Sequence, residues 1–313
     1  MQFIKSMMAA HDERNFRTYY YEKFGIGGVD EKKSLEILLK EQPLNIGKLR
    51  QFCLRFQVPA MYRIHLWKVI LGITPANPKS TEFVMSQRRQ QYENLHHALM
   101  VMRRINSNTP PGEVYTKMYL LQTGMLSFED HDLKNPENKA LVSMGTSVSG
   151  IVEDDVDGYW ITTKFYTLFS KCKESLQKLP EKTIQYLKKE DTDQRLVNHL
   201  NKHDVWGCLP LVDWYRRCFS NVLPDTSFER VWDKVIGGSC SILIYVAVSI
   251  FLTFKRPLLS MNSRDDMVNY LLKIPGDSGD VLVIQAIELW QKHGGHMIQT
   301  KSDSPVFVDR SPS

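Results

Sequence analysis

The sequence predicts an all-α protein whose helices form one extended array. Apolar residues recur at helical spacing along most of the 313-residue chain, and glycine or proline separates many of the periodic segments. The clearest case is segment 228–236, where apolar residues fall at i, i+3, i+4, i+7 and i+8: Phe228, Val231, Trp232, Val235 and Ile236. We find no internal repeat and no low-complexity tract. We therefore expect a single helical domain.

The first third of the chain predicts three short helices and a long one. The short helices carry apolar stripes centred on Leu38, Phe52 and Leu66. They are expected to end at residues that stop helices: Pro43, Pro59 and Gly72. The long helix is expected to run from Thr81 to Ile105. Its main stripe consists of Val84, Tyr92, Leu95, Leu99 and Met102.

The middle of the chain predicts a helix over residues 115–121 and a loop over 124–136. The next helix is expected to open at the acidic cluster 153–155, since carboxylates are favoured at a helix N-terminus, and to continue through Phe169. Two shorter helical pieces are expected within residues 176–200, with the break at Pro180.

The C-terminal part begins with the helix at 228–236. Thr226 and Glu229 have capping-box spacing, and Gly237 can supply the left-handed residue that ends this helix. An apolar run covers residues 242–254, and a last helical pair surrounds a turn at 275–279. Residues 281–290 are ambiguous between helix and strand.

The composition is that of an ordinary globular protein and excludes several functions. The net charge is +5, but 40 basic and 35 acidic residues are interleaved, which argues against nucleic-acid binding. The five cysteines lack CxxC spacing, which predicts a reducing compartment and no zinc or redox motif. Cys218 and Cys240 are interpreted as small core residues. We expect no metal and no cofactor.

The chain is expected to be cytoplasmic. Its N-terminus lacks the apolar length of a signal peptide, and the most apolar segment is too short to cross a membrane as a helix. We expect residues 1–12 to be flexible, 13–293 to form the helical domain and 294–313 to be a disordered tail.

Three segments in order resemble the TBC domain, the fold of Rab GTPase-activating proteins. Residues 63–72 resemble its opening R-x-x-x-W-x-x-x-L-G element, residues 153–160 its E-x-D-A-F-W element, and residues 209–252 its C-terminal half. The resemblance extends from about Gln57 to Phe254. It implies a single all-α TBC domain.

The resemblance also implies two catalytic side chains that this sequence lacks. In the family motif I-x-x-D-x-x-R-T-x-P, an arginine neutralises charge on the transferred phosphoryl group; here Asn108 occupies that position. In the motif Y-x-Q-G, a glutamine orients the attacking water; here Lys139 occupies that position. The family's GTPase-activating activity is therefore expected to be absent or unconventional.

A TBC scaffold that lacks these two catalytic side chains, the arginine and glutamine fingers, resembles one branch of the family. The same resemblance is carried by residues 14–17, 20–23, 31–40 and 153–162. That branch supplies the third subunit of the tuberous sclerosis complex. The resemblance implies binding to the hamartin coiled coil and, through it, to tuberin, which carries the catalysis that restrains Rheb–mTOR growth signalling. Recruitment to lysosomal or vesicle surfaces would then come through the complex.

A docking ridge for such a coiled coil is predicted on the long helix. Leu95, Leu99, Met100 and Met102 are the candidate partner-binding residues, because methionine adapts to helical surfaces and segment 98–102 is apolar on all sides. The alternative is that this segment is buried on both faces.

Two other functions stay open. The chain is a Rab GTPase-activating protein if Arg103, Arg104 or Lys139 acts as a surrogate finger, and a Rab-binding adaptor if it captures the GTPase without hydrolysis. The acidic cluster at 153–157 could suggest a metal site but is interpreted as acidic charge at a helix N-terminus. The histidines at 96–97 and 293–296 lack nearby carboxylate or cysteine partners at metal-ligand spacing.

Overall fold

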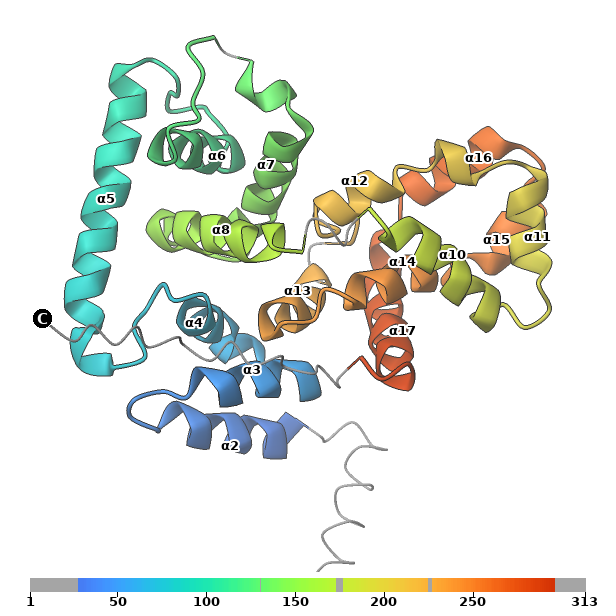
Figure 1. Ribbon diagram of the computed structural model, residues 1–313, viewed down its shortest axis with the longest axis horizontal. Coiled ribbons are helices and arrows are strands. Elements are labelled where there is room, and N and C mark those ends of the chain that lie inside the picture. Colours follow the sequence, from blue (N-terminus) through green and yellow to red (C-terminus); the bar gives the residue numbers. More distant parts are fainter. Residues whose placement is uncertain (1–27, 130, 173–176, 225–226, 296–313) are drawn as a thin grey trace, which may run out of the picture.

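The computed structural model describes residues 28–129, 131–172, 177–224 and 227–295, and every regular element in these ranges is a helix (Figure 1). The first half contains α2 (Gly28–Leu39), α3 (Ile46–Arg55), α4 (Ala60–Ile70), α5 (Thr81–Val101), α6 (Pro111–Gln122), α7 (Pro136–Ser149) and α8 (Asp155–Ser170). The second half contains α10 (Leu179–Glu190), α11 (Arg195–Lys202), α12 (Leu211–Arg216), α13 (Phe228–Gly237), α14 (Ile242–Thr253), α15 (Lys255–Ser260), α16 (Arg264–Leu272) and α17 (Gly279–Lys292). Short 3-10 turns lie at Pro78–Ser80, Asp132–Lys134, Trp206–Cys208 and Gly276–Ser278. The all-α prediction is confirmed. Residues 1–12 and nearly all of 294–313, for which disorder was predicted, lie outside the described ranges.

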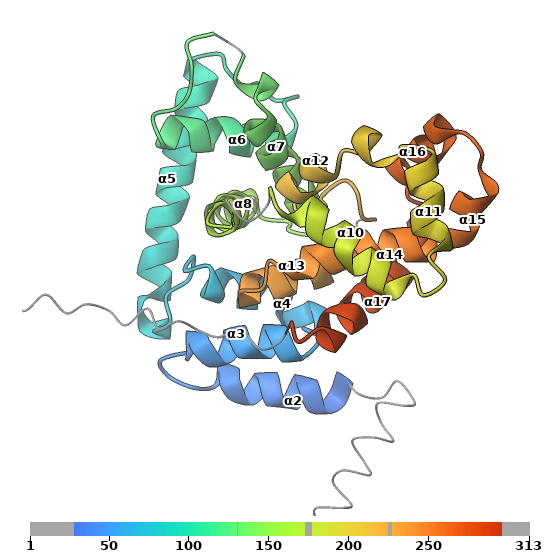
Figure 2. The same ribbon diagram turned by 45° about the vertical axis from the view of Figure 1, so that its right-hand side comes forward.

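The apolar run at 242–254 forms α14, a central helix of the C-terminal half. Its residues from Ile242 to Phe251 are all buried, and α10, α13 and α17 pack around it (Figure 2). Burial on every side explains why this helix is apolar all round rather than along one stripe. None of the helices in the described ranges has the length and apolarity needed to cross a membrane.

A buried charge cluster joins the N-terminal helices to α13. The Arg63 guanidinium of α4 pairs with Asp233 at 3.2 Å and with Glu229, and Trp67 Nε1–H donates to Asp233 Oδ1 at 2.8 Å. Lys234 donates to carbonyl oxygens at the end of α3, including that of Cys53 at 2.7 Å. Burial raises the pKa of Asp233 to about 6, although the Arg63 charge opposes that shift. The first family element at 63–72 is therefore fixed to the helix at 228–236.

Helices α6 and α7 cross at a close contact between two glycines. A Cβ at Gly112 would lie 2.9 Å from the Thr146 backbone nitrogen and closer still to the Val142 carbonyl oxygen. A Cβ at Gly145 would lie 3.0 Å from the Gly112 Cα. Only a residue without a side chain allows this approach at Gly112.

Gly112→Ala is expected to lower the free energy of unfolding by about 1–3 kcal/mol, because the helices must separate to admit the methyl group. Urea denaturation of the purified chain measures this. Gly207→Ala is the matched control, since no atom lies within 4 Å of its added Cβ. Equal stabilities of the two variants would contradict the close-packing explanation.

Four sequence predictions about helix limits are corrected. Helix α7 was not predicted; Pro136 begins it rather than closing the loop, and Asn135 Oδ1 caps it by accepting from the Glu137 N–H at 2.9 Å. The break between α10 and α11 lies at 191–194, since Pro180 stands in the first turn of α10, where no N–H partner is lost.

The ends of α13 also differ from the prediction. Gly238, with φ of 114°, is the left-handed residue, and Gly237 is helical and packs against Leu54. Glu229 pairs with Arg63 instead of capping the helix, and Thr226 lies outside the described residues. The ambiguous segment 281–290 is helical, within α17.

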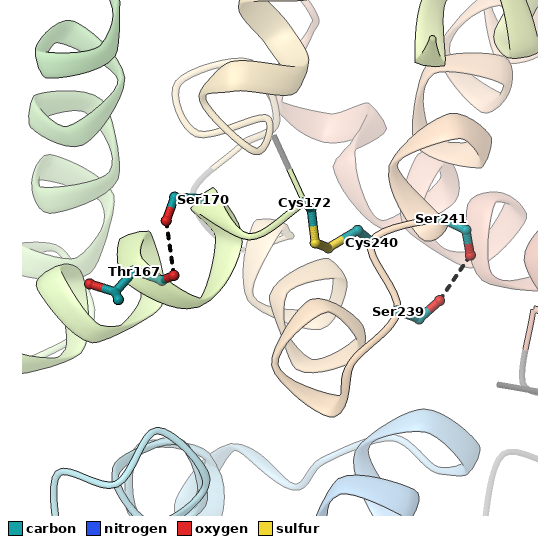
Figure 3. Close-up of a disulfide and its surroundings, with 6 residues drawn as sticks. All are labelled: Thr167, Ser170, Cys172, Ser239, Cys240 and Ser241. Atoms are coloured by element: carbon teal, nitrogen blue, oxygen red, sulfur yellow. Dashed lines mark hydrogen bonds between the residues drawn. A yellow bond between two sulfur atoms is a disulfide. The ribbon is translucent and has the colours of Figure 1, made fainter. Parts of the chain in front are cut away.

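Cys240 is not the core residue that the sequence suggested. It is half-buried in the turn between α13 and α14 and forms a disulfide with Cys172, which follows α8 (Figure 3). The Ser239 and Ser241 hydroxyls on either side of it are 2.9 Å apart. The bond ties the end of α8 to this turn. Cys218 is fully buried, as predicted.

Candidate functional site

The position expected to hold an arginine finger lies in the turn between α5 and α6. Asn108 is exposed, and its backbone N–H donates to Asn106 Oδ1 at 2.8 Å. The Asn106 N–H donates in turn to Thr109 Oγ1 at 2.9 Å, which closes the turn. The Asn108 side chain carries no charge, so this turn presents nothing at that position that could neutralise a phosphoryl group.

The position expected to hold the glutamine lies in the first turn of α7. Lys139 is exposed, and its backbone N–H donates to the Asn135 carbonyl oxygen at 2.9 Å. An ammonium group has only hydrogen-bond donors, so it lacks the acceptor through which a glutamine amide orients water. Glu137, at the position expected for the tyrosine, accepts from Arg216 Nε at 3.1 Å.

The two candidate surrogate arginines have different environments. Arg104 donates to the carbonyl oxygens of Ser127 at 2.9 Å and Phe128 at 3.0 Å, and it pairs with Asp132 at 3.0 Å. Its side chain is only 14% exposed, so it holds the loop after α6 and does not project from the surface. Arg103 ends α5 in the left-handed conformation, with φ of 56°, and is exposed.

The inner face of α5 packs onto α6 and α8. The Arg88 guanidinium lies over the Trp160 ring at 4.7 Å and donates to the Ile73 carbonyl oxygen at 2.7 Å. The Tyr92 and Tyr159 rings meet edge-to-face at 5.8 Å. Leu99 continues this face and is completely buried. These contacts hold α5 against α6 and α8 at the edge of the molecule (Figure 1).

The outer face of α5 is exposed along its whole length. Among its exposed residues, six are spaced four and three apart: Phe83, Gln87, Gln90, Asn94, His97 and Val101. This spacing places the six residues on one face of the helix, and we call this row the seam. In a coiled coil such positions are apolar, whereas here only Phe83 and Val101 are. The middle of the seam is polar, and a shallow groove of about 500 Å³ there is lined mainly by amides, including Gln87, Gln90 and Asn94.

The C-terminal end of α5 is the most apolar part of its exposed surface. Met100, Val101 and Met102 are 41%, 67% and 45% exposed. Of the four predicted docking residues, Met100 and Met102 therefore face solvent and Leu95 is half-buried. Leu99 is buried on the inner face of this end of the helix.

Apolar residues in the neighbouring loop add to the exposed surface at this end. Met125 is 67% exposed and Phe128 is fully exposed. The sequence predicted a loop over residues 124–136 and no binding role for it. The signal available there was the presence of large apolar side chains where a loop normally carries polar ones.

Comparison with known proteins identifies the fold family. Residues 151–259 match the family model of the Rab-GTPase-TBC domain. Over 289 residues the chain is 45% identical to TBC1 domain family member 7 of Homo sapiens, a match that covers 92% of this chain and 98% of that protein. The chain belongs to the TBC-domain family. The Danio rerio protein of the same name is 42% identical over 291 residues, with the same coverage of both chains.

A solved TBC domain has the same fold at low sequence identity. The Ypt/Rab-GAP domain of Gyp1p superposes with a TM-score of 0.57 and 15% identity, covering 85% of this chain and 99% of that one. The family model begins just before α8 and ends within α15, so it includes the buried helices α13 and α14. Helix α5 precedes it. The exposed seam is therefore carried by the part of this TBC-domain chain that lies outside the family match.

Proposed function

We propose that this chain is a non-catalytic TBC-domain subunit that binds the hamartin coiled coil and stabilises the tuberous sclerosis complex. The observation that carries the proposal is the outer face of α5, a 21-residue helix whose seam is exposed and whose end presents Met100, Val101 and Met102. A partner helix that packs along this seam would bury those three apolar side chains.

The finger positions support a non-catalytic role. With Asn108 and Lys139 in those positions, the chain supplies neither the charge nor the water-orienting acceptor that the family's catalysis uses. Because Arg104 is tied to the loop after α6, it is a poor surrogate. The proposed role is then to hold hamartin, and through it tuberin, while tuberin acts on Rheb to restrain mTOR growth signalling.

The extent and location of the subunit follow from the same proposal. The TBC domain would occupy residues 13–293. The subunit would work in the cytoplasm and reach lysosomal or vesicle surfaces through its complex. Its membrane recruitment would then depend on the partners rather than on its own surface.

Met100→Asp tests the docking face. Because the Met100 side chain is partly exposed, a carboxylate there leaves the fold intact but must be desolvated when a coiled coil packs against it. We expect the dissociation constant of the purified hamartin coiled coil to rise by about 30-fold or more, the effect of a hot-spot residue. Isothermal titration calorimetry measures it.

Val281→Asp on α17 is the matched control, since Val281 is 58% exposed and lies on a different helix. It is expected to bind as the wild type does, and circular dichroism should show folded protein for both variants. Wild-type affinity of the folded Met100→Asp variant would contradict docking on this face.

The second candidate function is binding or activation of a Rab GTPase. The exposed Arg103 favours it, because this cation lies five residues from Asn108 and, within the part of the chain that the structure describes, no side-chain hydrogen bond or ion pair holds it. In that case, loss of the Arg103 charge would abolish GTP hydrolysis or Rab capture.

A further inference from the structure

An open cavity lies beside the C-terminal end of α5, outside the seam itself. Its volume is about 450 Å³, and its apolar lining comes from Met102, Leu121, Leu126 and Phe128. These residues belong to the end of α5, the end of α6 and the loop that follows α6. Figure 1 shows this loop at the same end of the molecule as the end of α5.

The loop is held in place by polar contacts from Arg104 and Asp132. Arg104 binds the Ser127 and Phe128 carbonyl oxygens, and Asp132 Oδ1 accepts from the Ser127 backbone N–H at 3.1 Å. The Arg104–Asp132 pair is itself 14% and 7% exposed. Lys117 Nζ donates a hydrogen bond to the Arg104 carbonyl oxygen at 2.9 Å. The backbone at Phe128 is therefore fixed.

The Phe128 side chain nevertheless lies fully in solvent, and Met125 in the same loop is 67% exposed. A large apolar side chain that is exposed to water on a backbone held by hydrogen bonds is suited to be a binding anchor. We use the term terminal patch for the five exposed apolar residues at this end: Met100, Val101, Met102, Met125 and Phe128.

We propose that the loop carrying Phe128 is the second wall of the coiled-coil docking surface, and that the cavity receives one large apolar side chain of the partner helix. This inference rests on the proposed function, because the patch is continuous with the seam of α5. The exposed Arg103 lies between the cavity-lining residues Met102 and Arg104. The seated residue of the partner is therefore expected to be flanked by a carboxylate.

Phe128→Ser is the main test, because this side chain is fully exposed and its replacement should leave the fold intact. We expect the dissociation constant of the purified hamartin coiled coil to rise about tenfold or more in calorimetry. Arg103→Glu should also weaken binding, and more strongly at low than at high salt, because a charge pair is screened. Val281→Ser is the matched control and should bind normally.

The outcomes separate this inference from the proposed function. If Met100→Asp abolishes binding and Phe128→Ser leaves it unchanged, the loop is not a wall of the site and the inference fails, while docking on α5 stands. If wild type and all variants fail to bind the coiled coil, the proposed function fails first. A concentration-dependent dimer in analytical ultracentrifugation that Phe128→Ser dissociates would assign the patch to a second copy of the chain and overturn the inference.

Discussion

Replacing Arg63 with alanine is expected to destabilise the folded protein by about 3–5 kcal/mol, because it leaves buried carboxylates without their counter-charge. The Arg63 side chain is 7% exposed, and those of its partners Asp233 and Glu229 are 2% and 21% exposed. The variant also loses the hydrogen bond from Arg63 to the Val58 carbonyl oxygen at 2.9 Å. Urea denaturation followed by circular dichroism measures the change in unfolding free energy.

The loss should depend on pH through Asp233. Burial raises the pKa of this carboxyl from 3.8 to about 6, so the folded state takes up its proton more readily than the unfolded state does. Wild-type stability from this group therefore falls as pH rises from about 4 to about 6. Since the Arg63 charge opposes the rise, its removal raises the pKa further. The effect of Arg63→Ala is then expected to be larger at about pH 7.5 than at about pH 5, where the carboxyl is protonated in both proteins.

Arg89→Ala provides the matched control for an exposed pair. The Arg89 and Asp154 side chains are 55% and 44% exposed at a distance of 2.8 Å. Solvent-exposed pairs contribute between 0 and about 1 kcal/mol, so this variant should remain close to wild type. If Arg63→Ala were as mild as Arg89→Ala, the buried cluster would not join α4 to α13 as described.

The second large effect concerns catalysis. Rab proteins loaded with GTP are expected to hydrolyse it at their intrinsic rate in the presence of a large excess of this chain. An arginine finger alone accelerates hydrolysis by about 10³–10⁵, and the proposed occupant of that position, Asn108, carries no charge. Single-turnover hydrolysis with a panel of Rab proteins measures the rate, and the Ypt/Rab-GAP domain of Gyp1p serves as the positive control.

Arg103→Ala distinguishes a surrogate finger from its absence. If the chain accelerates any Rab and Arg103→Ala removes the acceleration by orders of magnitude, the non-catalytic role is contradicted. Arg104→Ala is a weaker probe, because losing this side chain also releases the Ser127 and Phe128 carbonyl groups. We expect Rab proteins to hydrolyse GTP at their intrinsic rate with the wild type and with both variants.

Local periodicity was sufficient to predict most helices. The stripe of Phe228, Val231 and Trp232 became the buried face of α13, and the family elements at 63–72 and 209–252 lie in contact through Asp233. Helix α7 was missed because a proline opens it and it contains three serines, a threonine and a glycine, which are weak helix formers. Its stability comes from the close crossing with α6 at Gly112 and Gly145, a tertiary contact that propensity does not report.

The candidate site was predicted only in part, because exposure depends on neighbours distant in sequence. Periodicity assigned Leu99 and Met102 to one stripe, yet Leu99 is buried and Met102 is exposed near the end of α5. Phe128 had no predicted role, since its exposure follows from a loop held by Arg104 and Asp132. The finger positions stay predictions, since they rest on the motif register that places Asn108 and Lys139 there.

The most direct test of the subunit role is recovery of the tagged full-length chain from cells, with quantification of the proteins that co-elute. We expect hamartin and tuberin at stoichiometric yield, moving with the chain as one species in size-exclusion chromatography. Recovery of a GTP-bound Rab with neither hamartin nor tuberin would contradict the proposed role.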